Sequence, residues 1–242
     1  MNMKVIVTEN YEEMSKVAAD ILIDVVKKNP CAVLGLATGS SPIGAYQNMA
    51  KDHKENGTSY KQVRTVNLDE YVGLTADHDQ SYAYFMRTNL FDHIDIDQKN
   101  TNLPCGSAPD AQAECDRYNA LLDVMKQDVQ VLGLGSNGHI GFNEPNTPFD
   151  SVTHLVDLTE NTIKDNSRLF NSIDEVPRQA FTMGLTNIMN AKKILILANG
   201  EGKANAIREL VNGEIREEVP ATILRNHPDC ILICDELAGK YI

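Results

Sequence analysis

Hydrophobic and polar positions follow one another along this chain as short apolar runs and longer amphipathic stretches. The apolar runs have the length of strands and predict strands at residues 3–8, 32–36, 63–68, 129–134, 154–158, 193–198 and 230–234. Apolar side chains recur at helical spacing over residues 10–28, 110–126 and 201–211. Because strand and helix patterns take turns from end to end, the sequence predicts an α/β fold with a mostly parallel sheet covered on both faces.

No repeat, low-complexity segment or flexible linker interrupts this pattern, so residues 1–242 are predicted to form a single domain. Residues 146–178 differ from the rest because they are polar and contain Pro148 and Pro177. We interpret this segment as an insertion over the functional site that acts as a lid.

The charge of the chain restricts its partners. Its formal net charge is -12, which argues against nucleic acid, since binding to nucleic acid requires lysines and arginines that neutralise phosphates. A small phosphorylated ligand needs only a local basic pocket. No apolar run has the length of a membrane span, and the first residues turn polar too early for a signal peptide. The five cysteines have no zinc-site spacing. We therefore expect a cytoplasmic protein that does not bind membranes.

The stretch 133–145 carries the densest polar chemistry. It follows an apolar strand and combines His139 with the amides of Asn137 and Asn143 and the carboxylate of Glu144. A carboxylate beside an imidazole orients the ring and makes it a better base, so His139 and Glu144 form a candidate acid–base pair. The alternative is a histidine with a purely structural role in a loop.

The stretch 35–42 predicts an anion-binding turn. It directly follows a strand, and we expect Ser41 to cap the helix after it. Free N–H groups at a helix start, together with the hydroxyls of Thr38, Ser40 and Ser41, suit a phosphate. The alternative is a turn that only caps its helix.

A second turn, at residues 199–203, repeats this pattern after a later strand. Lys203 falls in the first turn of the predicted helix 201–211, where the helix dipole disfavours a cation unless an anion is bound there. Gly213 is the expected end of that helix. Arg168, in the lid segment, is placed to close the pocket over the anion. An exposed, solubilising Lys203 is the alternative.

Asp69 and Glu70 directly follow the third predicted strand. If the strand continues through them, their side chains point to opposite sides, so one faces a cleft as a base and the other is structural. Two ordinary acids at a strand end are equally compatible with these residues alone.

Gly133, Gly135 and Gly138 match a dinucleotide-binding fingerprint. That motif requires a helix to open at its third glycine. The residues that follow Gly138 have two prolines and no helical period, so NAD binding is not predicted.

Taken together, five stretches resemble the glucosamine-6-phosphate deaminase family. They are LGLATGSSP, NLDEYVGL, GLGSNGHIGFNEP, NSRLF and ANGEGKA, in that order along the chain. The resemblance implies a three-layer α/β/α sandwich with a modified Rossmann-like sheet. It implies conversion of glucosamine 6-phosphate and water into fructose 6-phosphate and ammonia, a hydrolytic C–N cleavage in amino-sugar catabolism, with no cofactor and no metal.

The resemblance also assigns roles to residues. Asp69 is implied as the base that moves a proton between C2 and C1. His139 is implied in opening the pyranose ring, with Glu144 as its carboxylate partner and Asn137 beside it. The implied phosphate-binding residues are Thr38, Gly39, Ser40, Ser41, Arg168 and Lys203.

The chain departs from the family pattern at two places. Some members have Asp at the position of Asn137, and without that charge we expect a pH–rate profile at lower pH. Residues 146–157 contain no Lys or Arg, so we expect no activation by N-acetylglucosamine 6-phosphate. We expect a monomer or small homo-oligomer. The alternative functions are a hydrolase like 6-phosphogluconolactonase and a non-catalytic sugar-phosphate sensor.

Overall fold

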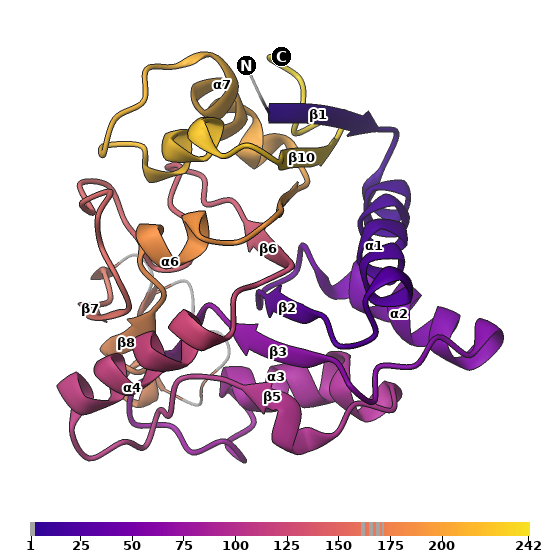
Figure 1. Cartoon of the computed structure of the whole chain (residues 1–242). Helices are drawn as coiled ribbons and strands as arrows, with labels where there is room; N and C mark the ends of the chain where they lie inside the picture. Colours follow the sequence, from indigo (N-terminus) through magenta and orange to yellow (C-terminus); the bar gives the residue numbers. More distant parts are fainter. Residues whose placement is uncertain (1–2, 161–162, 165–166, 168–169, 171) are drawn as a thin grey trace.

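Parallel strands form the larger of two sheets in the computed structural model, which describes residues 3–160, 163–164, 167, 170 and 172–242 (Figure 1). In spatial order its strands are β1 (Met3–Thr8), β10 (Cys230–Asp235), β9 (Ile194–Ala198), β6 (Val129–Gly133), β2 (Val33–Leu36), β3 (Arg64–Asn67) and β5 (Thr101–Asn102). Every pairing between these neighbours is parallel. The predicted parallel sheet is confirmed.

Helices cover both faces of this sheet and make a three-layer α/β/α sandwich. On one face lie α1 (Tyr11–Lys28) and α2 (Ile43–Asn56), and on the other lie α4 (Ala111–Val124), α6 (Leu185–Met189) and α7 (Ala204–Asn212) (Figure 1). The chain passes outward from β2 to β3 and β5 and then returns to β6, beside β2, before it continues to β9 and β10. Since parallel crossovers are right-handed, this reversal of direction sends the helices to opposite faces and creates a switch point between β2 and β6.

Short elements complete the described chain. They are α3 (Tyr82–Asn89) and the 3-10 turns η1 (Phe91–His93), η2 (Gln98–Asn100), η4 (Ile173–Glu175), η5 (Glu201–Lys203) and η6 (Pro220–Asn226).

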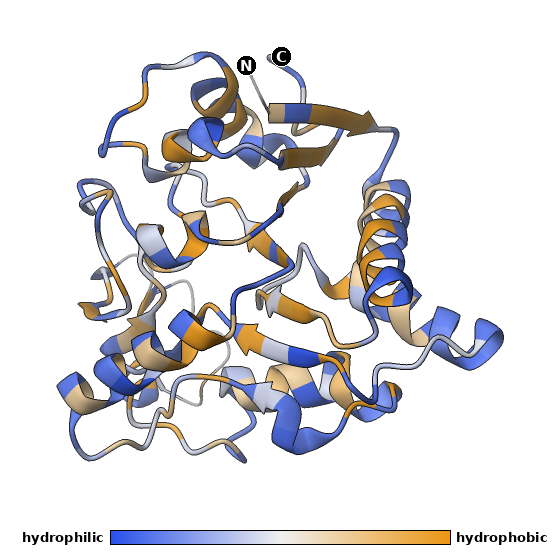
Figure 2. Ribbon diagram, in the orientation of Figure 1, coloured by the Kyte–Doolittle hydropathy of each residue, from blue (hydrophilic) through white to orange (hydrophobic). Residues whose placement is uncertain are grey.

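The first helix, α1, shows how local sequence sets an element. The side chain of Asn10 accepts a hydrogen bond from the Glu13 N–H and so caps the helix start, while two lysines in the last turn suit the negative end of the helix dipole. Its apolar positions face the sheet: Met14 and Leu22 are fully buried. Figure 2 shows mostly hydrophobic strands in the larger sheet, whereas α1 and α4 carry both kinds of residue. The hydrophobic effect on these apolar faces holds the layers together.

The second sheet is antiparallel and, in the described chain, is not hydrogen-bonded to the strands of the first. Its strands, in spatial order, are β4 (Asp69–Tyr71), β8 (Gln179–Thr182) and β7 (His154–Asp157). The strand predicted at residues 154–158 therefore exists but belongs to this smaller sheet. The sequence pattern missed β5 and β8, which have two and four residues, and it treated β4 only as a possible continuation of the third predicted strand.

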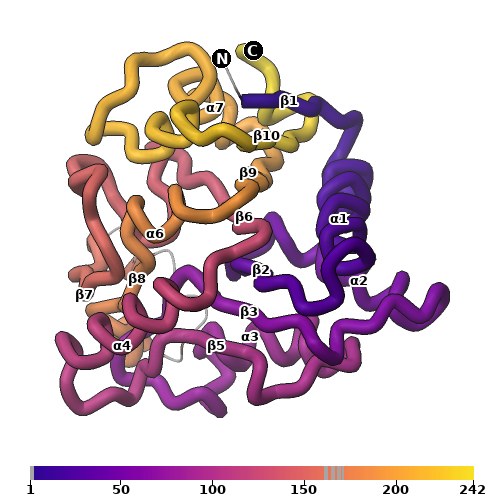
Figure 3. The backbone as a smooth tube through the Cα atoms, viewed as in Figure 1, coloured from indigo at the N-terminus to yellow at the C-terminus, as the bar shows by residue number. Residues whose placement is uncertain are grey.

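The core continues through the three layers. Leu22 of α1, Leu132 of β6 and Ile207 of α7 belong to one buried cluster. The first and last strands, β1 and β10, are paired neighbours, so the two ends of the chain lie close together at one edge (Figure 3). Within the described residues, every helix is too short or too polar to cross a bilayer.

Candidate active site

A cleft of about 780 Å³ lies at the switch point of the larger sheet. The loops that follow the neighbouring strands β2 and β6 both line it. Ligands of open α/β sheets bind at such a place, because loops at the carboxyl ends of the two strands leave in opposite directions there. The volume is in the range of small-molecule sites.

The loop after β2 presents small polar residues to the cleft. They are Thr38, Gly39, Ser40 and Ser41. Gly39 has φ +95°, which residues with a side chain rarely adopt, so the turn depends on glycine at this position. The Tyr11 hydroxyl of α1 supports the loop: it donates to the Ser40 carbonyl (2.9 Å) and accepts from the Gly44 N–H (2.9 Å). Tyr11 therefore supports the turn on one side, while the residues of the turn line the cleft.

Ser41 does not cap α2, and that prediction was wrong. The N-cap position is Pro42, with no side-chain hydrogen bond to the helix. The Ser41 hydroxyl instead donates to Asn199 Oδ1 over 2.9 Å. Because Asn199 follows β9, this bond joins the two predicted anion turns directly.

Lys203 lies in the second turn and lines the same cleft. The predicted helix 201–211 is split into η5 and α7, with Lys203 at the N-cap of α7 and Gly213 as its C-cap. No carboxylate of the described residues is within ion-pair distance of its ammonium. Burial lowers the pKa of Lys203, because desolvation disfavours its charged form. A partly buried cation without a counter-charge favours a bound anion at this end of the cleft.

The loop after β6 brings three of the predicted residues into one hydrogen-bonded chain. Asn137 Oδ1 lies 2.7 Å from His139 Nδ1, and Asn137 Nδ2 donates to Glu144 Oε2 over 2.8 Å. The Glu144 carboxylate is also 3.6 Å from His139 Nδ1. His139, followed by the bond from Asn137, lowers the pKa of Glu144. Glu144 is thus a neighbour of the histidine as expected, but Asn137 bridges them.

The hydrogen bonds fix which nitrogen of His139 carries the proton. Asn137 Oδ1 also accepts from the His139 backbone N–H (3.1 Å), and Asn137 Nδ2 faces a carboxylate, so the amide has only one consistent orientation. An amide oxygen only accepts, and therefore Nδ1 of His139 carries a hydrogen and Nε2 is the acceptor of the neutral ring. A Cβ at Gly135 would lie 2.4 Å from His139 Nδ1, so glycine at this position leaves the space that the imidazole ring occupies.

Asp69 and Glu70 point to opposite sides of β4, as predicted for a strand that continues. Asp69 lines the same cleft as His139. Glu70 turns away and accepts backbone N–H bonds from Tyr71, Tyr82 and Ala83, each 2.9 Å, which anchors the start of α3. The sequence alone did not show which of the two carboxylates faces the cleft. The contacts show that Asp69 does and that Glu70 binds backbone N–H groups instead.

The Asp69 carboxylate is almost completely buried, with 6% of the residue exposed. Burial and then repulsion from Glu70 raise the pKa of Asp69 to about 8. No hydrogen bond from another described residue reaches its carboxylate oxygens. An acid in this setting can accept a proton near neutral pH, as a general base must.

The helix that a dinucleotide-binding motif requires does not open at Gly138, as the sequence predicted. Residues 135–138 close a turn, with the Gly138 N–H donating to the Gly135 carbonyl over 3.0 Å. The cleft has further walls that the sequence analysis missed: Tyr71, Tyr82, Phe142 and Asn199. The sequence did carry a signal for the start of α3, the helix that begins with Tyr82. Serine is a preferred N-cap residue, and Ser81 caps this helix by accepting a hydrogen bond from the Tyr84 N–H.

The lid segment contributes Phe170 to the cleft wall. Arg168, predicted in the same segment, lies outside the described residues. The motion of residues 146–178 stays a prediction.

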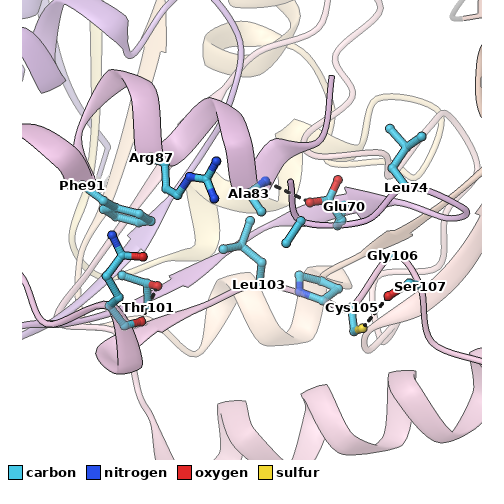
Figure 4. Close-up of a pocket in the computed structure, with 13 residues that line it drawn as sticks. Glu70, Leu74, Ala83, Arg87, Phe91, Thr101, Leu103, Cys105, Gly106 and Ser107 are labelled. Carbon is cyan, nitrogen blue, oxygen red and sulfur yellow. Dashed lines mark hydrogen bonds between the residues drawn. The ribbon is translucent and has the colours of Figure 1, made fainter. Parts of the chain in front are cut away.

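A smaller cavity of about 330 Å³ lies behind β4 and α3 (Figure 4). Glu70 and Arg87 are its charged residues. Both already have partners, because Glu70 receives three backbone N–H groups and Arg87 Nη1 donates to Asp77 over 2.8 Å. No three acidic, histidine or cysteine side chains of the described residues converge as a metal site requires.

Comparison with known proteins decides the family. The family model of glucosamine-6-phosphate isomerases/6-phosphogluconolactonase matches residues 8–232. The chain belongs to this family. The glucosamine-6-phosphate deaminase of Clostridium perfringens is 54% identical over 241 residues, which cover 99% of this chain and 100% of that protein. A deaminase of a Geobacillus species is 50% identical over 235 residues, 97% of this chain and 94% of its own.

Solved structures of family members agree with the fold. A monomeric glucosamine-6-phosphate deaminase matches with a TM-score of 0.96 at 46% identity, over 99% of this chain and 100% of that one. The 6-phosphogluconolactonase of Trypanosoma brucei matches with a TM-score of 0.78 at 19% identity, over 99% and 98%. At that lower identity the match shows the fold alone.

Proposed function

We propose that this chain is a glucosamine-6-phosphate deaminase, which converts glucosamine 6-phosphate and water into fructose 6-phosphate and ammonia. The observation that carries the proposal is that both anion turns and both proton-transfer candidates, Asp69 and His139, line one cleft. The deaminase relatives at 46–54% identity over nearly the whole chain support the same activity.

The joined turns after β2 and β9 are the phosphate end of the proposed site. Ser40 and Ser41 offer hydroxyls, the turn at Gly39 exposes backbone N–H groups, and Lys203 supplies the positive charge. Gripping a phosphate away from the reacting carbons orients the sugar and provides binding energy for the chemical steps. Arg168 is proposed to add a second cation from the lid segment.

Ring opening is assigned to His139. Its Nε2 is the acceptor, because Nδ1 carries the hydrogen bonded to Asn137. It takes the proton from the anomeric hydroxyl and delivers it to the ring oxygen, which breaks the C1–O5 bond and leaves the open-chain aldehyde. Asn137 and Glu144 hold the ring and stabilise the imidazolium formed in between.

The carbon chemistry is assigned to Asp69. Its carboxylate removes the proton from C2, the electron pair forms the C1–C2 double bond, and the aldehyde oxygen receives a proton that the substrate's ammonium group gives up, which leaves an enolamine. Return of a proton to C1 gives an iminium at C2, which water hydrolyses to the ketone and ammonia. The substrate's own ammonium group favours the ionised form of Asp69, which opposes the rise in the pKa of Asp69 caused by burial. The sum is an isomerisation coupled to hydrolytic loss of nitrogen.

An ammonia assay tests this proposal. Purified protein is incubated with glucosamine 6-phosphate, and both ammonia and fructose 6-phosphate are measured. Equal release of the two is expected, together with loss of turnover by about 10³-fold or more in Asp69→Asn, since the base is removed. Binding of glucosamine 6-phosphate to Asp69→Asn, measured by calorimetry, is expected to persist because the phosphate turns are unchanged.

Two results would redirect the proposal. Hydrolysis of 6-phosphogluconolactone without ammonia release would make the chain a lactonase of the same family. Binding of the sugar phosphate without any turnover would make it a sensor. The five cysteines, all free, agree with the reduced cytoplasm in which we place the enzyme.

A further inference from the structure

The two proton-transfer residues sit on separate parts of the fold. His139 is carried by the loop after β6 in the larger sheet, whereas Asp69 is carried by β4 in the smaller sheet. The proposed reaction requires both groups at one sugar ring, so something must set their relative positions. Errors of about 1 Å in such positions cost on the order of 10²-fold in rate.

Strand β8 is the physical link between these two parts. On one side it pairs with β4, with Thr182 directly opposite Asp69, and the Met183 N–H donates to the Leu68 carbonyl over 2.7 Å. Its other edge pairs with β7, while the Thr182 side chain and the Met183 carbonyl at its end contact the histidine loop. The Phe142 N–H donates to Thr182 Oγ1 over 3.1 Å, and Asn143 Nδ2 donates to the Met183 carbonyl over 2.8 Å.

The loop approaches β8 closely because of a glycine. Gly141 has φ +59°, and a Cβ there would lie 2.9 Å from Thr182 Oγ1 and 3.5 Å from Asp69 Oδ2. Asn143 closes the turn from within, since its Nδ2 also donates to the Ile140 carbonyl over 2.8 Å. Thr182 and Asn143 are both fully buried, and neither is among the described residues that line the cleft.

We infer that Thr182 and Asn143 are positioning residues of the deaminase: through β8 they fix the His139 loop relative to Asp69 without contacting substrate. This inference rests on the proposed function. The Thr182 hydroxyl is the more testable of the two, because valine has nearly the same shape and removes only the acceptor for the Phe142 N–H. An unpaired buried N–H then favours movement of the loop.

The test compares Thr182→Val with Thr182→Ser in the ammonia assay. Thr182→Val is expected to lower kcat about 10–100-fold while KM changes less than about threefold, because the phosphate turns after β2 and β9 are untouched. Thr182→Ser keeps the acceptor and is expected to retain kcat within about threefold. Thr65→Val is the matched control: Thr65 is a buried strand residue whose hydroxyl has no partner within the described chain, so kcat is expected to be unchanged.

A purely structural role for Thr182 would lower the melting temperature and leave kcat per folded molecule at the wild-type value, and that result overturns the inference. Gly141→Ala is a second test of the same contact. It retains the Thr182 hydroxyl but pushes the loop away from β8, and it is expected to lower kcat at least as much as Thr182→Val does. A wild-type protein that releases no ammonia contradicts the proposed function. An active wild type with fully active Thr182→Val and Gly141→Ala contradicts only the positioning role.

Discussion

The two ends of the cleft are built in different ways. The proposed phosphate end consists of two strand-to-helix turns of the larger sheet, each a short continuous segment, joined by the Ser41–Asn199 hydrogen bond. The proposed proton-transfer end brings Asp69 from the smaller sheet against a loop of the larger one. The first end is largely formed by local backbone conformation, whereas the second exists only when two sheets are assembled. Substitutions at the two ends should therefore affect different kinetic constants.

The largest effect is expected at the proton-transfer end. His139→Gln removes the group proposed to open the ring, so kcat is expected to fall by about 10²–10⁴-fold, while KM stays within about threefold. Steady-state ammonia release measures both constants. His154→Gln, at a half-buried histidine on β7 that is not among the described residues lining the cleft, is the control and should behave as wild type. A fall in substrate affinity with normal kcat would place His139 at the binding end instead.

The phosphate end should respond in the opposite way. Lys203→Met keeps the length of the side chain but removes its charge, so KM is expected to rise about 10–100-fold, as loss of a charged hydrogen bond costs about 1.5–3 kcal/mol. The kcat value should change less than KM. Lys192→Met, at an exposed lysine paired with Asp128, serves as control. An unchanged KM in Lys203→Met would contradict the assignment of this cation to the phosphate.

Asp69 should set the acid side of the pH–rate profile. Its base form is the active one, and burial raises the pKa of Asp69 to about 8, so kcat/KM should fall about 10-fold per pH unit below that value. The fall in kcat should occur at lower pH, because the bound ammonium of the substrate stabilises the carboxylate. A kcat/KM profile that stays flat from about pH 6 to about pH 9 would exclude Asp69 as the titrating base.

The same buried acid affects stability. Its folded-state pKa is above the unfolded value of about 4, so the stability linked to Asp69 is present at low pH and is lost as the pH rises through about 8. Asp69→Asn is therefore expected to raise the free energy of unfolding by about 1–3 kcal/mol at pH near 9 and by less at pH near 5. Denaturant unfolding at both pH values measures this. A variant that is less stable at the higher pH would contradict the sign.

The smallest effect is expected at Asn137. Asn137→Asp places a negative charge where the amide oxygen now lies 2.7 Å from His139 Nδ1, which favours the protonated ring. The pH–rate profile should move to higher pH by about half to one unit. Asn137→Ala separates charge from contact, since it removes the bridge to Glu144 without adding a charge. An unmoved profile in Asn137→Asp would mean that this position does not tune the histidine.

Sequence periodicity alone determined the α/β class, because buried parallel strands and amphipathic helices leave long, regular patterns, as in residues 10–28. The candidate residues of the anion turns and the histidine loop were also visible, since strand-end glycines and clustered polar groups are local signals. Tertiary structure decided what those signals could not. It places Asp69 rather than Glu70 in the cleft, bonds the Ser41 hydroxyl to Asn199 instead of its helix, and brings Thr182 into contact with the loop that carries His139. These outcomes depend on contacts between residues 12 to more than 150 positions apart, and short-range patterns carry no information about such distances.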